Sequence, residues 1–160
     1  MAHFEQQAFL QQTKDIYPRF FKKKKVLEIG SLNINGTARD FFKDCDYIGV
    51  DVVDGNGVDL VGIAHELDLG DDYDVIVSCE SMEHDPNLDR TIQKIKACLK
   101  KGGLLVGTAA GINRYYHTDG GIDYFRPIEQ EFIDYAFSDF AEFESICTRG
   151  YRDIYFRGIK

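Results

Sequence analysis

The feature that most constrains the fold of this 160-residue chain is the alternation of short apolar, β-branched runs with segments of helical spacing. Runs of strand length occupy residues 26–30, 46–51, 73–80 and 103–110, and a shorter run occupies residues 58–61. Strands that alternate with helices predict a mostly parallel sheet covered on both faces. Ligands of such sheets bind at the carboxyl ends of the strands, so we expect the functional site at that edge.

Four segments have helical spacing or composition, and we predict helices at residues 3–17, 37–44, 88–101 and 128–137. The first helix is expected to end before Pro18, because a residue that precedes proline avoids helical backbone angles. Gly102 and Gly103 are expected to stop the third helix. Two β-rich runs at residues 140–148 and 151–160 are separated by a short turn, and they predict a hairpin at the end of the chain.

The connection after the second strand is too short for a normal crossover. Only VVDGNG lies between Asp51 and Val58, whereas a full crossover takes at least about 10 to 12 residues with its helix. We therefore expect the second crossover helix to be missing. Residues 58–61 should form a short edge strand that a loop reaches.

Composition excludes several classes of protein. The chain has 44% hydrophobic and 29% charged residues and no apolar run of membrane-spanning length, which predicts a globular protein outside the membrane. Its N-terminus lacks an export signal, so we expect a cytoplasmic location. Four scattered cysteines without a CxxC pair predict thiols and no metal site. A net charge of -8 argues against nucleic acid as a partner, because the phosphates of nucleic acids are bound by Lys and Arg. The composition does not decide the oligomeric state.

The turn that follows the first predicted strand is rich in small residues. In VLEIGSLNINGT, the residues Gly30, Ser31, Asn35 and Gly36 let the backbone approach a ligand closely. The helix expected near Thr37 would aim its free amides at a polar ligand group. A tight connection without a ligand is the alternative interpretation of this turn.

Asp51 makes the ligand interpretation more specific. It ends the run YIGVD and lies 21 positions after Gly30 (51 minus 30), close to the interval of about 20 residues at which an acid binds ribose hydroxyls. The alternative is an acid that only caps a strand end. Glu28 lies inside the first predicted strand, where a buried carboxylate needs a partner, and we expect it to accept hydrogen bonds near a cofactor.

In their order and spacing, five segments resemble the class I S-adenosylmethionine-dependent methyltransferases, in particular the small branch grouped with the type 11 methyltransferase domain. They are VLEIGSLNINGT, YIGVD, VDLVGIAHEL, YDVIVSCESMEHD and LKKGGLLVGTAAG, and the resemblance extends from Val26 to Lys160. It implies an α/β, Rossmann-like methyltransferase fold, in which helices flank a mostly parallel seven-stranded sheet with a C-terminal antiparallel strand pair. The implied reaction transfers a methyl group from S-adenosylmethionine to an acceptor.

The resemblance also implies which residues contact the cofactor. They are Glu28, Gly30, Ser31, Asn35 and Gly36 at the methionine end, Asp51 at the ribose, Val52, Ile63, Ala64 and His65 around the adenine, and Cys79 and Glu80 near the sulfonium. Two positions depart from the family pattern. The usual GxGxG turn is replaced by GSLNING, and Ile63 stands where the family commonly has an acid for the adenine amino group.

We expect a single methyltransferase domain over residues 1–160. Its parts are an N-terminal helix and lead-in at residues 1–24, a cofactor-binding core at residues 25–110, an acceptor loop at residues 111–127, and a C-terminal helix and hairpin at residues 128–160.

If the reaction uses a general base, the candidates are His84 and His117, because neutral imidazole accepts a proton near pH 7. A capping or surface role is the alternative for each. A loop this long is more often functional than decorative, so the acceptor is expected to meet it. Its candidate binding residues are Tyr115, Tyr116, Tyr124 and Arg126. The alternative is that the aromatic residues only pack the loop onto the sheet. A small-molecule or saccharide acceptor fits this composition.

Two alternatives from other functional classes remain at this point. One is a NAD-type oxidoreductase, although the chain lacks GxGxxG and has little room for a substrate domain after the fifth strand. The other is a noncatalytic protein that binds S-adenosylmethionine without turnover. Titration with S-adenosylmethionine and with NAD separates these hypotheses.

Overall fold

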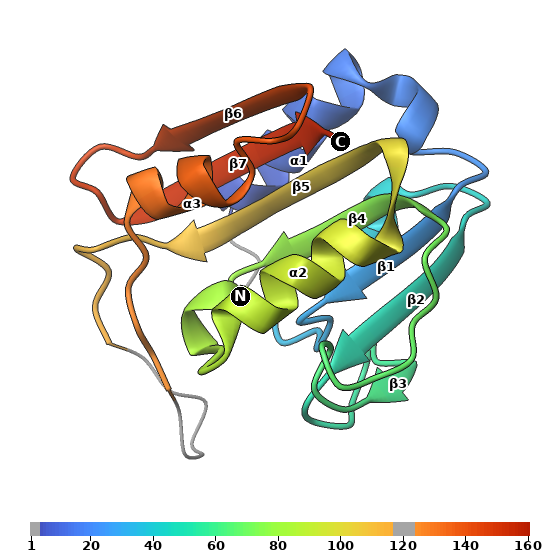
Figure 1. The fold of residues 1–160 in the computed structure, drawn as a ribbon, viewed down its shortest axis with the longest axis horizontal. Coiled ribbons are helices and arrows are strands. Elements are labelled where there is room, and N and C mark those ends of the chain that lie inside the picture. The colour runs from blue at the N-terminus through green and yellow to red at the C-terminus, as the bar shows by residue number, and fades with distance from the viewer. Residues whose placement is uncertain (1–3, 117–123) are drawn as a thin grey trace.

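The computed structural model of the protein describes residues 4–116 and 124–160 (Figure 1). Its centre is a seven-stranded sheet with the order β3-β2-β1-β4-β5-β7-β6. The strands are β1 Lys25–Ile29, β2 Asp46–Asp51, β3 Leu60–Val61, β4 Tyr73–Cys79, β5 Leu99–Ala110, β6 Glu142–Cys147 and β7 Asp153–Ile159. Only β7 runs antiparallel to its neighbours, β5 and β6. The expected fold class, with its terminal antiparallel pair, is confirmed.

The register of the central strands decides where the loops emerge. Ile29, the last residue of β1, pairs with Val50 of β2 on one side and with Ser78 of β4 on the other. Because these strands are parallel and end level with one another, the turns that follow β1, β2 and β4 leave the sheet at the same edge. This edge is where parallel α/β sheets bind ligands.

Helices cover both faces of the sheet. In Figure 1, α2 Leu88–Cys98 and α3 Gln130–Ala136 lie on the near face, while α1 Phe4–Ile16 lies behind β5 and β7. Alternating side chains of the strands feed two separate apolar cores, as the period of two in a strand requires. Leu27 faces α2 and α3, whereas Val26 faces α1.

The prediction of a helix at residues 37–44 is wrong. In its place is η2, a single 3-10 turn at Ala38–Phe41. The Thr37 hydroxyl caps this turn by accepting from the Arg39 N–H at 3.1 Å. The turn stops because the Lys43 N–H donates to the Phe21 carbonyl at 2.9 Å and the Lys43 carbonyl accepts from Lys23 at 3.0 Å. Long-range pairing therefore overrides the local helical pattern.

The end predicted for α2 is also wrong. The helix ends at Cys98, and Leu99 begins β5 directly, so Gly102 and Gly103 lie inside the strand and do not stop the helix. The Gly102 N–H donates to the Lys160 carbonyl at 2.7 Å, and Lys160 donates back to the Gly103 carbonyl at 3.1 Å. Lys160, directly after β7, thus holds this segment by two backbone hydrogen bonds. The local sequence pattern does not indicate these long-range bonds.

The expected irregular third strand is confirmed. Residues 52–59, all of which are described, contain no helix, and β3 is a two-residue edge strand that pairs with Val50 and Asp51. In the described ranges 4–116 and 124–160, no helix combines the length and apolar character needed to cross a membrane.

Phe137 provides a test of the core beneath α3. Its side chain is fully buried, and its ring lies 5.3 Å from that of Phe140, 5.4 Å from that of Phe143 and 6.2 Å from that of Phe156, measured between centroids. We expect Phe137→Ala to lower the free energy of unfolding by about 3 to 5 kcal/mol. The matched control Phe4→Ala, at a side chain that is 81% exposed, should change it by less than about 0.5 kcal/mol. Urea unfolding of both variants measures the difference, and equal losses would contradict this packing.

Candidate functional site

Gly30 begins the turn after β1 and fixes how closely two loops approach. Its φ is +81°, a left-handed backbone angle, and its N–H donates to the Val50 carbonyl at 2.9 Å. A Cβ atom at this position would lie 2.3 Å from the Cβ of Ser81 in the turn after β4. Glycine is therefore required both by the backbone angle and by the contact, and the turns after β1 and β4 meet here.

The rest of the glycine-rich turn is held by the connection between β2 and β3. The Asn33 N–H donates to the Asn56 carbonyl at 2.8 Å, and the Asn33 side-chain oxygen accepts from the Gly36 N–H at 2.8 Å. Ser31 is buried, and its hydroxyl has no hydrogen-bond partner among the described residues. Asn35 is exposed at the tip of the turn. The turn thus presents polar groups at the carboxyl edge of the sheet.

Asp51 lies beside this turn at the end of β2. One carboxylate oxygen accepts from the Leu32 N–H at 3.0 Å, and the other accepts from the Val53 N–H at 3.1 Å. Each oxygen of an ionised carboxylate has two lone pairs, so capacity for a further donor remains on both. The structure therefore brings the predicted acid and the predicted glycine turn together through a direct hydrogen bond.

The residues expected around an adenine lie on the next two loops. Val52 and Ile63 are apolar and 65% and 42% exposed, whereas Ala64 and His65 are buried. They are neighbours because β2 and β3 pair in parallel, with Asp51 opposite Val61. The two exposed aliphatic side chains suit contact with a flat apolar ligand.

Glu28 is buried on the α1 face of β1, as its alternation with Leu27 predicts. The Tyr47 hydroxyl donates to its carboxylate at 2.9 Å, so the expected hydrogen bond exists and comes from β2. Burial raises the pKa of Glu28 to about 7, although the hydrogen bond from Tyr47 and the nearby charge of Arg39 lower it. Burial therefore favours the protonated form of Glu28 more than that of an exposed glutamate.

The end of β4 carries an acidic pair, Glu80 and Glu83, on the turn that contains η3 (Met82–His84). Glu80 has a φ of +50°, a strained angle for a residue with a side chain, and its N–H donates to the Thr108 carbonyl at 2.9 Å. Neither carboxylate has a hydrogen-bond partner among the described residues. Arg114 lies beside the pair: its Nη2 is 3.9 Å from a Glu80 oxygen, and its Nη1 donates to Asp153 at 2.7 Å.

Glu83 is the most deeply buried of these acids, with 1% of its surface exposed. Burial first, and then the nearby charge of Glu80, raise its pKa to about 8, while the amides of Glu83 and Ala110 lower it without reaching hydrogen-bond geometry. Burial and the neighbouring acid therefore favour the protonated form of Glu83. Cys79, the residue before Glu80, is also buried, and burial raises the pKa of its thiol to about 12.

His84 connects this acidic turn to the expected acceptor loop. Its Nε2 lies 3.8 Å from a Glu83 oxygen, and its ring lies 5.7 Å from the ring of Phe125. The Arg126 N–H donates to the Glu83 carbonyl at 2.7 Å, which fixes the end of the loop on η3. Tyr116 packs its ring edge-on to Phe125, with centroids 5.5 Å apart.

The tyrosines predicted to bind the acceptor lie at the surface. Tyr115, Tyr116 and Tyr124 are all exposed, and Arg152 lies over the Tyr115 ring at 5.8 Å. His117, the second candidate base, lies outside the described residues.

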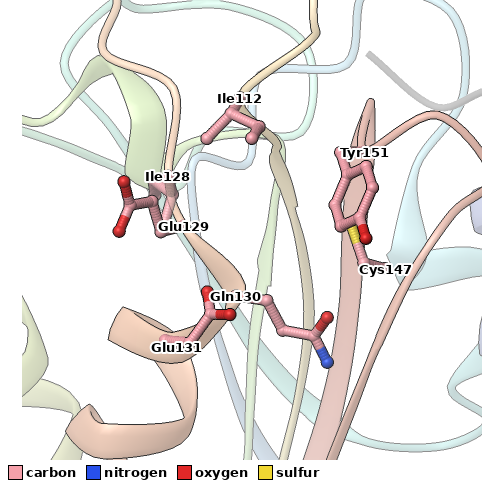
Figure 2. A pocket seen from close by; sticks show the side chains of 7 residues that line it. All are labelled: Ile112, Ile128, Glu129, Gln130, Glu131, Cys147 and Tyr151. Atoms are coloured by element: carbon pink, nitrogen blue, oxygen red, sulfur yellow. The ribbon is translucent and has the colours of Figure 1, made fainter.

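A cavity of 290 Å³ opens beside the first and last residues of this loop (Figure 2). It lies between the end of β5, the start of α3 and the turn that joins β6 to β7, so the strand order separates it from Gly30 and Asp51. Its lining residues are Ile112, Ile128, Glu129, Gln130, Glu131, Cys147 and Tyr151. Figure 2 shows these side chains on both sides of the opening.

Sequence reasoning missed Glu83, Asp153 and Thr91. Glu83 had one local signal, since it follows Glu80 by three residues on the turn after a buried strand. Asp153 and Thr91 had none, because their partners Arg114 and His65 are 39 and 26 residues away in the sequence.

Comparison with known proteins identifies the family. The profile of the methyltransferase domain family matches residues 1–141. No curated protein matches the chain by sequence. Solved structures match it by fold, and they include three methyltransferases with low sequence identity to this chain.

One is a 1,6-didemethyltoxoflavin-N1-methyltransferase from Burkholderia thailandensis, solved with S-adenosylhomocysteine, at 16% identity and a TM-score of 0.65, covering 98% of this chain and 80% of that one. Another is phosphoethanolamine N-methyltransferase 2 from Haemonchus contortus, at 15% identity and a TM-score of 0.71; the match covers 96% of this chain but only 53% of that one.

The third is a methyltransferase from Archaeoglobus fulgidus that depends on S-adenosylmethionine, at 15% identity and a TM-score of 0.68, covering 96% of this chain and 94% of that one. These likenesses support the fold, and the family match supports the activity. The chain therefore belongs to the methyltransferase domain family, and its expected identity as a class I S-adenosylmethionine-dependent methyltransferase is confirmed.

Proposed function

We propose that this methyltransferase acts on a small-molecule or saccharide acceptor, with its cofactor bound across the turns after β1, β2, β3 and β4. The observation that carries the proposal is the hydrogen bond from the Leu32 N–H to the Asp51 carboxylate. It joins the glycine-rich turn to the acid that ends β2, and these two elements together suit the amino-acid and ribose parts of one ligand.

The groups at this edge fit S-adenosylmethionine. At the methionine end, the unpartnered hydroxyl of Ser31 and the left-handed turn at Gly30 suit a polar group held close to the backbone, with Glu28, Asn35 and Gly36 around them. Asp51 retains acceptor capacity for ribose hydroxyls. The exposed faces of Val52 and Ile63 suit the adenine, beside Ala64 and His65. Cys79 and Glu80 complete the site toward the reacting end.

When bound, S-adenosylmethionine supplies an electrophilic methyl group on a positively charged sulfur. The chain has to align the acceptor atom with that methyl group and to exclude water. The turn after β4 is suited to this task, because it carries Glu80 beside the proposed reacting end and continues directly into η3.

We place the acceptor against the loop at residues 111–127, which continues from β5. Tyr115, Tyr116 and Tyr124 offer exposed rings, and Arg126 offers a cation for a carboxylate or phosphate. The cavity in Figure 2 gives a larger acceptor room beside the loop. If the acceptor loses a proton, His84 is the first candidate for the base that takes it, and His117 is the second.

The acceptors of two structural neighbours support a small molecule. The Burkholderia enzyme is solved with 1,6-didemethyltoxoflavin, and the Haemonchus enzyme with phosphomonomethylethanolamine. We further propose that the division into a lead-in at residues 1–24, a cofactor core at 25–110, an acceptor loop at 111–127 and a terminal helix and hairpin at 128–160 describes one functional unit.

The proposal is tested by titrating the purified chain with S-adenosylmethionine and with NAD in a calorimeter. We expect binding of S-adenosylmethionine and no comparable binding of NAD. An acceptor screen that follows S-adenosylhomocysteine formation with small molecules and saccharides then tests turnover. Tight binding of NAD without binding of S-adenosylmethionine would contradict the proposal.

The ribose assignment predicts the effect of removing Asp51. Asp51→Ala should weaken S-adenosylmethionine binding at least about tenfold, because each hydrogen bond from a ribose hydroxyl to a carboxylate contributes roughly 1.5 to 3 kcal/mol. His84→Ala and His117→Ala should leave this affinity nearly intact and lower turnover. Calorimetry measures the affinities.

Because Asp51 also accepts from two backbone amides, circular dichroism must first show that the variant is folded. Asp51→Asn, which keeps one side-chain oxygen, is expected to lie between the parent and Asp51→Ala. An Asp51→Ala protein that is folded and binds like the parent would rule out the ribose assignment.

The raised pKa of Glu83 predicts how stability changes with pH. The folded protein holds a proton on Glu83 up to a pKa of about 8, whereas the unfolded chain releases it near the ordinary glutamate pKa of 4.5. The native state therefore binds more protons between these values, and stability falls as pH rises through this window. Glu83→Gln cannot ionise, so its melting temperature relative to that of the parent should rise from pH 5 to pH 9.

The control is Glu66→Gln at an exposed position, which should show no such trend. Thermal melts of the parent and both variants at pH 5, 7 and 9 make the comparison. A constant difference between Glu83→Gln and the parent would mean that Glu83 is ionised throughout this range.

A further inference from the structure

We infer that His65 recognises the exocyclic amino group of the cofactor's adenine, with its Nε2 atom as the hydrogen-bond acceptor. This inference rests on the proposed function, because it takes the cofactor to lie across the turns after β1, β2 and β3. It names an atom that selects the base, at a site where Ile63 has no polar group to do so.

The order of the strands directs the base toward His65. If Asp51 holds the ribose, the base continues past β2 toward the next strand, and β3 is that strand, with Val61 paired to Asp51. His65 follows Val61 by four residues (65 minus 61). It lies in the turn that is closed when the Glu66 N–H donates to the Ile63 carbonyl at 2.9 Å.

The hydrogen bonds behind the ring fix its tautomer. The Thr91 hydroxyl donates its hydrogen to the Asp85 carboxylate. The Thr91 oxygen is then the acceptor for the Nδ1 atom of His65, which lies 2.9 Å away. Nδ1 therefore carries the hydrogen, and in the neutral ring Nε2 carries a lone pair and accepts.

The Nε2 atom of His65 is the ring nitrogen to which no hydrogen bond is made by the described residues. His65 is 9% exposed, and its Nε2 is buried without a hydrogen-bond partner among the described residues. A buried acceptor without a donor costs free energy, so a donor from a ligand gains more here than on an exposed atom. Contact with the base requires the turn after β3 to shift outward, because neighbouring atoms cover Nε2.

The chemistry of the base matches this acceptor. The amino group of adenine donates two hydrogen bonds, whereas hypoxanthine has a carbonyl oxygen at the same place, which only accepts. The lone pair of Nε2 attracts the first and repels the second. Ile63 contributes an apolar contact to either base without distinguishing them.

The experiment compares two probes, S-adenosylhomocysteine and S-inosylhomocysteine, in which an oxo group replaces the amino group. Calorimetry on the full chain should show at least about tenfold tighter binding of S-adenosylhomocysteine, since sites built around a hydrogen bond reject analogues that lack it. His65→Ala should lose most of this preference, mainly through weaker binding of S-adenosylhomocysteine. Affinity for the inosine analogue should change little.

Two further variants separate recognition from packing. His65→Gln keeps a side-chain oxygen that accepts, so it should retain part of the preference. Thr91→Val keeps the imidazole but removes the partner that fixes its tautomer, so Thr91 acts as a positioning residue and the preference should fall without being abolished. Circular dichroism and melting curves establish that each variant is folded.

The binding results separate a failure of this inference from a failure of the proposed cofactor site. Equal binding of the two probes by the parent, or an unchanged preference in folded His65→Ala, would overturn the inference and leave His65 as a core histidine. Failure of the parent to bind either probe would overturn the proposed cofactor site, and the inference with it.

Discussion

The parallel pairing of β1 with β2 and β4 is the constraint on which the rest of the structure depends. Because Ile29 is level with both Val50 and Ser78, the turns after the three strands emerge side by side. Gly30 then allows the turns after β1 and β4 to touch, and the Leu32 amide binds Asp51 at the end of β2. The candidate site is a direct result of this register, since none of these contacts is local in sequence.

Two of the connections between the parallel strands contain little or no helix. The first crossover is reduced to η2, and residues 52–59, all described, contain no helix. The N-terminal helix α1 supplies the apolar cover on that face, where Phe9 and Leu10 contribute to the core. Its ring contact of Phe9 with Tyr155, at 5.2 Å between centroids, ties the first helix to the last strand. The fold therefore depends on segments at both ends of the chain.

Acidic groups concentrate at the edge where the proposed cofactor would carry a positive sulfur. Glu28, Glu80 and Glu83 are all buried, and burial raises the pKa of Glu28 to about 7 and that of Glu83 to about 8. Buried acids in such an arrangement share protons and lose them at higher pH than exposed acids. Burial thus limits the negative charge of these acids near neutral pH, and their ionisation lowers stability in alkaline solution.

Much of the architecture followed from local pattern. The β-branched runs predicted the main strands, because alternation and apolar content depend on residues near one another in the chain. The spacing of Gly30 and Asp51 predicted that a turn and an acid would meet, and the structure brings them together through Leu32. The six residues between Asp51 and Val58 predicted a missing crossover helix, since chain length alone excludes one.

The predictions that were wrong, and the contacts that the sequence did not indicate, depend on residues far apart in the chain. The helix at residues 37–44 gave way to pairing of Lys43 with residues 21–23, and the end of α2 moved because Lys160 binds the segment around Gly102. The hydrogen bond between Thr91 of α2 and His65 joins residues that are 26 positions apart in the sequence. Sequence by itself determined which segments form strands and which residue types line the edge. Only the tertiary structure decided which polar groups are paired and which are left over, because hydrogen-bond partners and burial are set by contacts between residues far apart in the chain.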